Sequence, residues 1–233
     1  MRRFKSDIPP NVVEQVTREF RRDGGAIYYR TTNCVLDGEV VGQRAYGEEG
    51  QLVIETPLRN GRKHGREFDW DDDGTLSLIE PYVNGKVHGT VKQYGRDGSV
   101  IGTYSLRHGT GYDVWRAEDE DGINISEIHT FKDGLRHGYE WWLMKPHLVW
   151  REANWHEGKH HGIEREWNSA NKLSRGFPGY WIKGERVDKR KYLRAAKNDP
   201  SLPPFRLKDN SPRRRFPSEI EALFLGSGQY RER

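Results

Sequence analysis

The chain has 233 residues, of which 33% are hydrophobic and 32% are charged. Globular domains usually approach half apolar residues, so a single thick hydrophobic core is not expected. An aromatic content of 12% argues against disorder, and the single cysteine, Cys34, excludes an internal disulfide. The chain has no apolar run long enough to span a membrane and no signal-peptide core, so we expect a cytoplasmic protein.

The net charge of +4 is unevenly distributed along the chain. Residues 31–182 carry 18 Lys and Arg against 24 Asp and Glu, whereas the two flanking segments together carry 21 against 11. The central region is therefore acidic, and the flanks together are basic.

Residues 1–35 are interpreted as an N-terminal helix with a lead-in to the central region. Val12, Val13, Val16 and Phe20 form one apolar stripe at helical spacing over residues 9–22. A single amphipathic helix in front of a sheet predicts a cap over the end of that sheet.

The central region repeats with a period of 24 residues. Two glycine series mark it, and each marks a turn. The first series consists of Gly50, Gly74, Gly98 and Gly122, of which the last three follow an aspartate; the second consists of Gly61, Gly85, Gly134 and Gly158, each four residues before another glycine. Apolar and polar residues alternate between these turns, which is typical of strands with one wet face. We therefore predict a mainly β fold: an elongated single-layer antiparallel sheet of about six stacked hairpins over residues 36–186, with short N- and C-terminal helices.

Residues 82–98 read Y-x-N-G-K-x-H-G followed by Y and D-G, which resembles the MORN-type repeat in the variant found in bacterial proteins labelled as antitoxins. The pattern departs where Lys145-Pro146 replaces the Asp-Gly turn. The resemblance implies a sheet of stacked hairpins that serves as a binding scaffold, and it implies no catalytic site.

Residues 187–233 form a basic C-terminal part. Asp188 is placed to cap a helix, a Pro-rich linker with Arg213, Arg214 and Arg215 follows, and a second short helix is expected from Ser218. Two interpretations stay open: these helices cap the repeat sheet, or the basic tail docks onto an acidic membrane surface or nucleic acid.

The stretch from Asp69 to Glu80 satisfies the calcium-loop pattern of an EF-hand, with Asp71, Asp72 and Asp73 as its central acids. An EF-hand also needs a helix on each side, whereas glycine turns and a proline flank this stretch. We therefore expect an ordinary solvated turn, with weak cation binding by the three aspartates as the alternative, and we predict no metal site and no cofactor.

Five histidines stand directly before a glycine, at positions 64, 88, 108, 137 and 161. Equivalent positions in successive hairpins lie too far apart to share one zinc ion, so we interpret these histidines as structural turn residues. The sequence contains no nucleophile motif and no phosphate-binding loop, and we predict that the protein is not an enzyme.

One feature is not explained by turn chemistry, namely a row of aromatic residues at related repeat positions. The row consists of Trp70, Tyr94, Trp115, Trp141 and Trp167. These residues either form the core of the sheet or expose a strip that anchors a partner protein. We predict a protein-binding scaffold, whose most concrete version neutralises a toxin; two sheets pairing face to face in a homodimer is an alternative use of the same apolar side.

Overall fold

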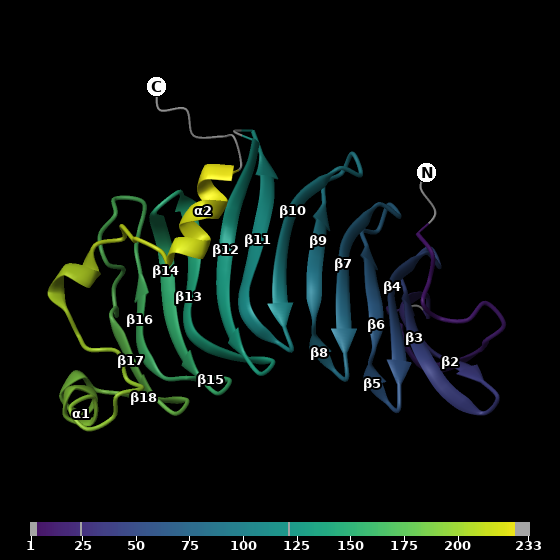
Figure 1. Cartoon of the computed structure of the whole chain (residues 1–233), viewed down its shortest axis with the longest axis horizontal. Coiled ribbons are helices and arrows are strands. Elements are labelled where there is room, and N and C mark those ends of the chain that lie inside the picture. The colour runs from purple at the N-terminus through teal and green to yellow at the C-terminus, as the bar shows by residue number, and fades with distance from the viewer. Residues whose placement is uncertain (1–3, 24, 121, 227–233) are drawn as a thin grey trace. The chain divides into compact units, whose positions relative to one another are not determined.

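The computed structural model describes residues 4–23, 25–120 and 122–226. The chain divides into two compact units, Met1–Gly109 and Thr110–Arg233, whose strands and helices are labelled in Figure 1. In both units almost all regular structure is β-strand, and consecutive strands pair antiparallel through hairpin turns. The prediction of a mainly β fold built from hairpins is confirmed.

The first unit contains ten strands that follow one another along its sheet. They are β1 Val13–Arg21, β2 Ile27–Leu36, β3 Glu39–Tyr46, β4 Leu52–Arg59, β5 Arg62–Lys63, β6 Gly65–Trp70, β7 Leu76–Val83, β8 Lys86–Val87, β9 Gly89–Tyr94 and β10 Val100–Arg107. The two-residue strands β5 and β8 extend the turns that connect β4 to β6 and β7 to β9.

The second unit contains eight strands and the helices of the chain's described part. They are β11 Thr110–Asp119, β12 Gly122–Lys132, β13 Leu135–Lys145, β14 Leu148–His156, β15 Lys159–His160, β16 Gly162–Glu166, β17 Gly179–Ile182, β18 Glu185–Val187, helix α1 Lys189–Ala195, a 3-10 turn Leu207–Asn210 and helix α2 Ser218–Gly226. No helix in the described residues is both long and apolar enough to cross a membrane.

The glycine period corresponds to the hairpin turns. The N–H of Asp71 donates to the carbonyl of Thr75 at 2.8 Å, and the N–H of Gly74 donates to the carbonyl of Asp71 at 2.9 Å. The turn that holds Gly98 repeats this pattern one period later. Gly74 and Gly98 have φ of 81° and 76°, a left-handed conformation that glycine adopts without the steric cost of a Cβ.

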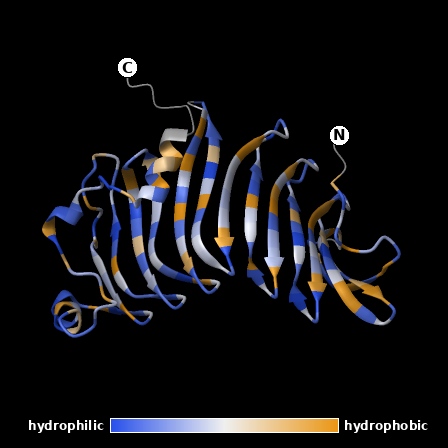
Figure 2. Ribbon diagram, in the orientation of Figure 1, coloured by the Kyte–Doolittle hydropathy of each residue, from blue (hydrophilic) through white to orange (hydrophobic). Residues whose placement is uncertain are grey.

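The strands present different residues on their two faces, and Figure 2 shows hydrophobic and hydrophilic residues alternating along them. In the first unit Phe68, Leu76 and Ile79 form a buried cluster against which Trp70 and Tyr94 pack. Glu67 and Asp69, the neighbours of Phe68 along β6, point to the opposite face because successive side chains of a strand alternate. One face of β6 is therefore aromatic, and the other carries carboxylates.

The predicted N-terminal helix is wrong, because strand β1 occupies its position. β1 pairs with β2 over its whole length, and the Thr17 hydroxyl lies 2.8 Å from that of Thr31. The apolar stripe that indicated a helix is not buried, since Val13 and Val16 are 65% and 56% exposed. Cross-strand pairing and the β-branched side chains decide the local structure here, and a helical pattern of four apolar residues does not outweigh them.

An extended segment takes the place of the expected helical cap in the first unit. Ile8 is buried at 3% exposure, and a Cβ on Gly42 would lie only 2.3 Å from its side chain. Asp7 binds the guanidinium of Arg66 at 2.5 Å, and Arg66 in turn lowers the pKa of that carboxyl. The segment in front of β1 thus lies against the sheet without forming a helix.

The C-terminal helices occur where they were predicted. Asp188 caps α1 by accepting a hydrogen bond from the N–H of Lys191 at 2.8 Å, and α2 begins at Ser218. Tyr192 of α1 is completely buried and donates its hydroxyl proton to the carbonyl of Pro203 at 2.6 Å. It packs with Ile163, Tyr180 and Leu202, so α1 covers the end of the sheet that β17 and β18 form.

We expect Gly162→Ala to lower the free energy of unfolding of the second unit by about 1–3 kcal/mol. Gly162 has φ of 148°, and a Cβ there would lie 2.6 Å from the Cβ of Asn154 on β14. Gly176→Ala is the matched control, since Gly176 also has positive φ but open space around it. Urea denaturation should show a clearly larger loss for the Gly162 variant; equal losses would show that backbone strain alone matters at both positions.

Candidate functional site

The five predicted aromatic residues do not share one environment. Trp141 and Trp167 are buried, at 6% and 3% exposure, whereas Trp70, Tyr94 and Trp115 are half-buried. The interpretation of the row as core therefore holds for Trp141 and Trp167. Their assignment to a partner-binding strip is corrected, because the chain's own C-terminal segment covers them.

The C-terminal segment between the 3-10 turn and α2 lies directly on these two tryptophans. Phe216 meets the ring of Trp141 edge-on at 5.2 Å, and the indole N–H of Trp167 donates to the carbonyl of Asn210 at 2.7 Å. The segment also bonds to the backbone of β14, where Val149 N–H donates to the carbonyl of Pro212 at 3.0 Å. It continues along the edge of β14 beyond the last contact of the preceding strand, in which the N–H of Trp167 donates to the carbonyl of Trp150, and Arg213 there pairs with Leu148.

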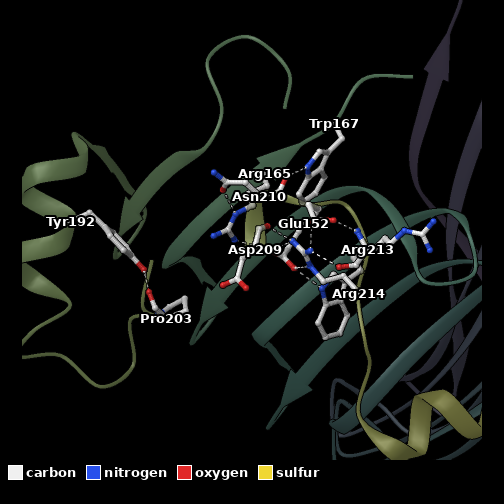
Figure 3. Close-up of polar contacts among 11 residues, drawn as sticks. Glu152, Arg165, Trp167, Tyr192, Pro203, Asp209, Asn210, Arg213 and Arg214 are labelled. Carbon is white, nitrogen blue, oxygen red and sulfur yellow. Dashed lines mark hydrogen bonds and ion pairs between the residues drawn. The ribbon is translucent and has the colours of Figure 1, made fainter. Parts of the chain in front are cut away.

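Arg214 anchors this segment through a buried ion cluster (Figure 3). Its guanidinium contacts both carboxylate oxygens of Glu152, at 2.6 and 3.1 Å, and stacks over the Trp167 ring at 5.0 Å. Arg165 binds the same carboxylate at 2.9 Å. Two arginines thus share one buried carboxylate, and Glu152 and Arg165 have side chains only 4% and 3% exposed.

This geometry corrects the interpretation of Arg214 as part of a basic tail that docks onto a partner. Arg214 is an internal anchor, while Arg213 and Arg215 remain exposed on the outer side of the segment. Deleting residues 207–233 would therefore uncover Trp141 and Trp167. Such a deletion tests the folding of the second unit and not the binding of a membrane or a nucleic acid.

The equivalent face of the first unit carries an open groove of about 840 Å³. Trp70 stacks on Phe68 at 5.8 Å, and Phe4 packs edge-on against Tyr94 at 5.9 Å. The remaining lining comes from two successive hairpin turns and the strands beside them: Asp73, Gly74, Thr75, Leu76, Lys92, Arg96, Asp97, Gly98, Ser99 and Val100. Val100, which also lines the groove, is 52% exposed.

Two carboxylates stand at the rim of this groove, one on each turn. The N–H of Thr75 donates to Asp73 at 2.8 Å, and the N–H of Ser99 donates to Asp97 at 2.8 Å. The N–H of Thr75 lowers the pKa of Asp73, and the side chain and N–H of Ser99 lower the pKa of Asp97, so both carboxyls are ionised at neutral pH.

The aspartates of the calcium-like pattern form a turn, as expected. Asp71, Asp72 and Asp73 lie between β6 and β7, and Glu80 belongs to β7, where Tyr82 donates a hydrogen bond to it. Within the described residues no group of three His, Cys, Asp or Glu side chains is arranged to hold a metal ion. Weak cation binding by the three aspartates alone stays a prediction.

The opposite face of the first unit carries a polar pocket that the sequence reasoning missed. Its volume is about 330 Å³, and it is lined by Thr17, Tyr29, Thr31, Gln43, Arg44, Ala45, Ile54, Thr56, Lys63, Glu67 and Asp69. Glu67 is buried and accepts hydrogen bonds from Thr56 at 2.5 Å and from Lys63 at 2.7 Å. Burial, with Glu67 and Glu80 nearby, raises the pKa of Asp69 to about 6. The alternation of apolar and polar residues predicted that Glu67 and Asp69 lie on the solvent-facing side of the sheet. The spacing of residues in the sequence did not indicate that neighbouring strands would enclose them.

We expect Asp69→Asn to stabilise the first unit by about 1–2 kcal/mol at pH 8, after allowing for partial solvent screening. The carboxyl has a pKa of about 6 in the fold against 3.8 otherwise, so its charge opposes folding above pH 6. Wild type regains this stability as the pH falls from 6 towards 4, and the advantage of the amide should then vanish. Urea denaturation at pH 8 and pH 4 tests this, with Asp72→Asn on the exposed turn as control. An advantage that persists at pH 4 would contradict it.

The histidines that precede glycines are turn residues that link neighbouring hairpins. The Nδ1 atoms of His88 and His161 accept hydrogen bonds from the N–H of His108, at 3.1 Å, and of Lys183, at 3.0 Å. His64 does the same with Asn84 at 3.4 Å. Each imidazole therefore fixes the first residue of a later turn, which confirms the structural interpretation for these three histidines.

His161 also contacts Ser201 at 2.9 Å, an arrangement that invites a catalytic interpretation. Because Nδ1 accepts from Lys183, a neutral imidazole carries its proton on Nε2 and donates it to the serine oxygen. The hydroxyl of Ser201 then donates to Asp199. A general base would need the opposite direction, so this contact ties the segment after α1 to the sheet and does not activate a nucleophile.

Comparison with known proteins shows no family for this chain. No family model matches the sequence, and no curated protein matches it. A solved structure described as a glycosylation associate protein (Gap123) complex from Streptococcus agalactiae aligns with a TM-score of 0.32 and 20% sequence identity. The match covers 52% of this chain and 20% of that chain.

Proposed function

We propose that the chain is a non-enzymatic scaffold that binds another protein through the groove lined by Trp70 and Tyr94. The observation that carries the proposal is the contrast between the two units. Trp141 and Trp167 of the second unit lie under the chain's own C-terminal segment, whereas the groove with Trp70 and Tyr94 is open.

The chemistry of the groove supports a protein ligand. Half-buried aromatic rings offer contact area at a small entropic cost, and charged residues of both signs surround them, which is the usual anatomy of a protein interface. The resemblance of residues 82–98 to a MORN-type repeat points to the same class of function. Neutralisation of a toxin is its most concrete version.

The experiment is site-specific photo-crosslinking in extract of the source cells. A photoreactive phenylalanine at Val100 samples the groove, and the same group at Leu207, which is 77% exposed in the second unit, serves as the matched control. We expect one partner that crosslinks from position 100 only and disappears with Trp70→Ala. Equal crosslinking from both positions, or crosslinking that is insensitive to Trp70, would argue against the groove as the binding surface.

A further inference from the structure

The two terminal segments place an aromatic ring on corresponding positions of the two units. Phe216 packs on Trp141, the third residue after Gly138, with ring centres 5.2 Å apart. Phe4 packs on Phe68, the third residue after Gly65, with ring centres 6.3 Å apart. A covering ring at this position is therefore supplied within each unit.

A second covering contact is formed in the second unit. Trp167, the fifth residue after Gly162, carries the guanidinium of Arg214 over its ring at 5.0 Å. Trp70 is the fifth residue after Gly65, and in the described part of the chain no cation lies over its ring.

The turns confirm that Trp70 and Trp167 are equivalent. Directly after Trp167, the N–H of Asn168 donates to the carbonyl of Lys172, and that of Asn171 donates to the carbonyl of Asn168, each at 2.9 Å. The turn of residues 71–75 after Trp70 has the same pair of hydrogen bonds. The turns that follow Trp70 and Trp167 therefore have the same backbone hydrogen-bond pattern.

The groove over Trp70 also has the charges that a guanidinium requires. Asp73 and Asp97 line it, and each accepts a backbone N–H of its own turn, from Thr75 and Ser99. Lys92 and Arg96 line it as well, so the formal charge of the lining is balanced, and stacking on the ring is the contact that would favour a guanidinium over other groups.

We propose that the groove receives an arginine-bearing extended segment of the partner protein, with the guanidinium stacked on Trp70 beside the carboxylates of Asp73 and Asp97. This deepens the proposed function and rests on it. The model for the contact is the chain's own segment of residues 209–216, whose Pro212 and Phe216 are buried and whose Arg214 stacks on Trp167. In the proposed complex the partner's arginine stacks on Trp70 as Arg214 stacks on Trp167 in the second unit.

The test uses a fluorescein-labelled peptide with the sequence of residues 209–216, Asp-Asn-Ser-Pro-Arg-Arg-Arg-Phe, added to the full chain. A second peptide carries citrulline, which is neutral and nearly isosteric, in place of each arginine. We expect the arginine peptide to bind at least about tenfold more tightly than the citrulline peptide by fluorescence anisotropy, a difference of about 1.4 kcal/mol. Trp70→Ala should remove this difference, whereas Trp70→Phe should keep most of it.

The variant Asp73→Asn with Asp97→Asn provides a readout that does not disturb the aromatic floor, since asparagine can still accept from the turn N–H groups. It should weaken the arginine peptide several-fold and leave the citrulline peptide unchanged. Trp70-dependent binding that is equal for both peptides would overturn the arginine assignment and leave the proposed function standing. Binding that is independent of Trp70 would show displacement of the resident segment in the second unit and would overturn the assignment to this groove. Competition by an excess of the Trp70→Ala chain, which keeps its own residues 209–216 but lacks the ring of the groove, would make the occupant the tail of a second copy and contradict a separate partner.

Discussion

Replacing Glu152 by alanine is expected to lower the free energy of unfolding of the second unit by about 3–5 kcal/mol. Glu152 is the shared carboxylate of Arg165 and Arg214, and the arginine side chains are only 3% and 12% exposed. Without it, two guanidinium groups would lie close together in a poorly solvated place with no counter-charge. Trp141 would lose an acceptor as well, because its indole N–H donates to Glu152 at 2.9 Å.

Urea denaturation followed by tryptophan fluorescence measures this loss, and Glu185→Ala on the exposed strand β18 is the control. The control should change stability by less than about 0.5 kcal/mol. A Glu152 variant as stable as the control would mean that the cluster is solvated in solution and that Arg214 does not hold the C-terminal segment down.

Replacing Trp141 by alanine is the second large effect, with an expected loss of about 3–5 kcal/mol. The indole is 6% exposed, stacks on Tyr139 at 5.3 Å and receives the edge of Phe216. Its removal leaves a cavity between β13 and the covering segment, which the rigid strands cannot close.

Trp150→Ala is the matched control for this change, since Trp150 lies on the neighbouring strand β14 and is 36% exposed. We expect a loss at least twofold smaller there, measured by the same denaturation.

The comparison also decides how Trp141 can be used in binding studies. If its loss unfolds the unit, failure to bind a partner in that variant says nothing about a binding surface; if the fold survives unchanged, the partner-strip interpretation of Trp141 returns.

The hairpins could be predicted from the sequence because each turn is determined by a few adjacent residues. A turn such as Asp73-Gly74 needs residues that accept left-handed backbone, and its recurrence at a fixed period exposes the architecture. The N-terminal segment lacked such markers. Its valines fit a helical stripe and a strand equally well, and pairing with β2 decided between them.

The environments of the aromatic residues could not be predicted in the same way. Trp70 and Trp167 occupy the same repeat position, yet one lines a groove and the other lies under Asn210 and Arg214. What separates them is a contact with a segment more than forty residues further along the chain, and no periodic pattern encodes it. The polar pocket could not be predicted for a related reason. Asp69 is buried by residues of neighbouring strands and not by its own sequence neighbours.

Histidine side chains that accept a backbone N–H from a later turn link one hairpin to the next. The stability of each linked hairpin therefore depends on its neighbour, as in a one-dimensional cooperative system. His161 offers its Nδ1 lone pair to Lys183 only while the ring is neutral, and burial lowers the pKa of this histidine below its usual 6.5. Because the unfolded chain takes up the proton first, the stability that this link contributes is complete above pH 6.5 and declines as the medium becomes more acidic. Mild acid should therefore loosen the end hairpin of β17 and β18 before the hairpins behind it, and the array should melt from its edge inward.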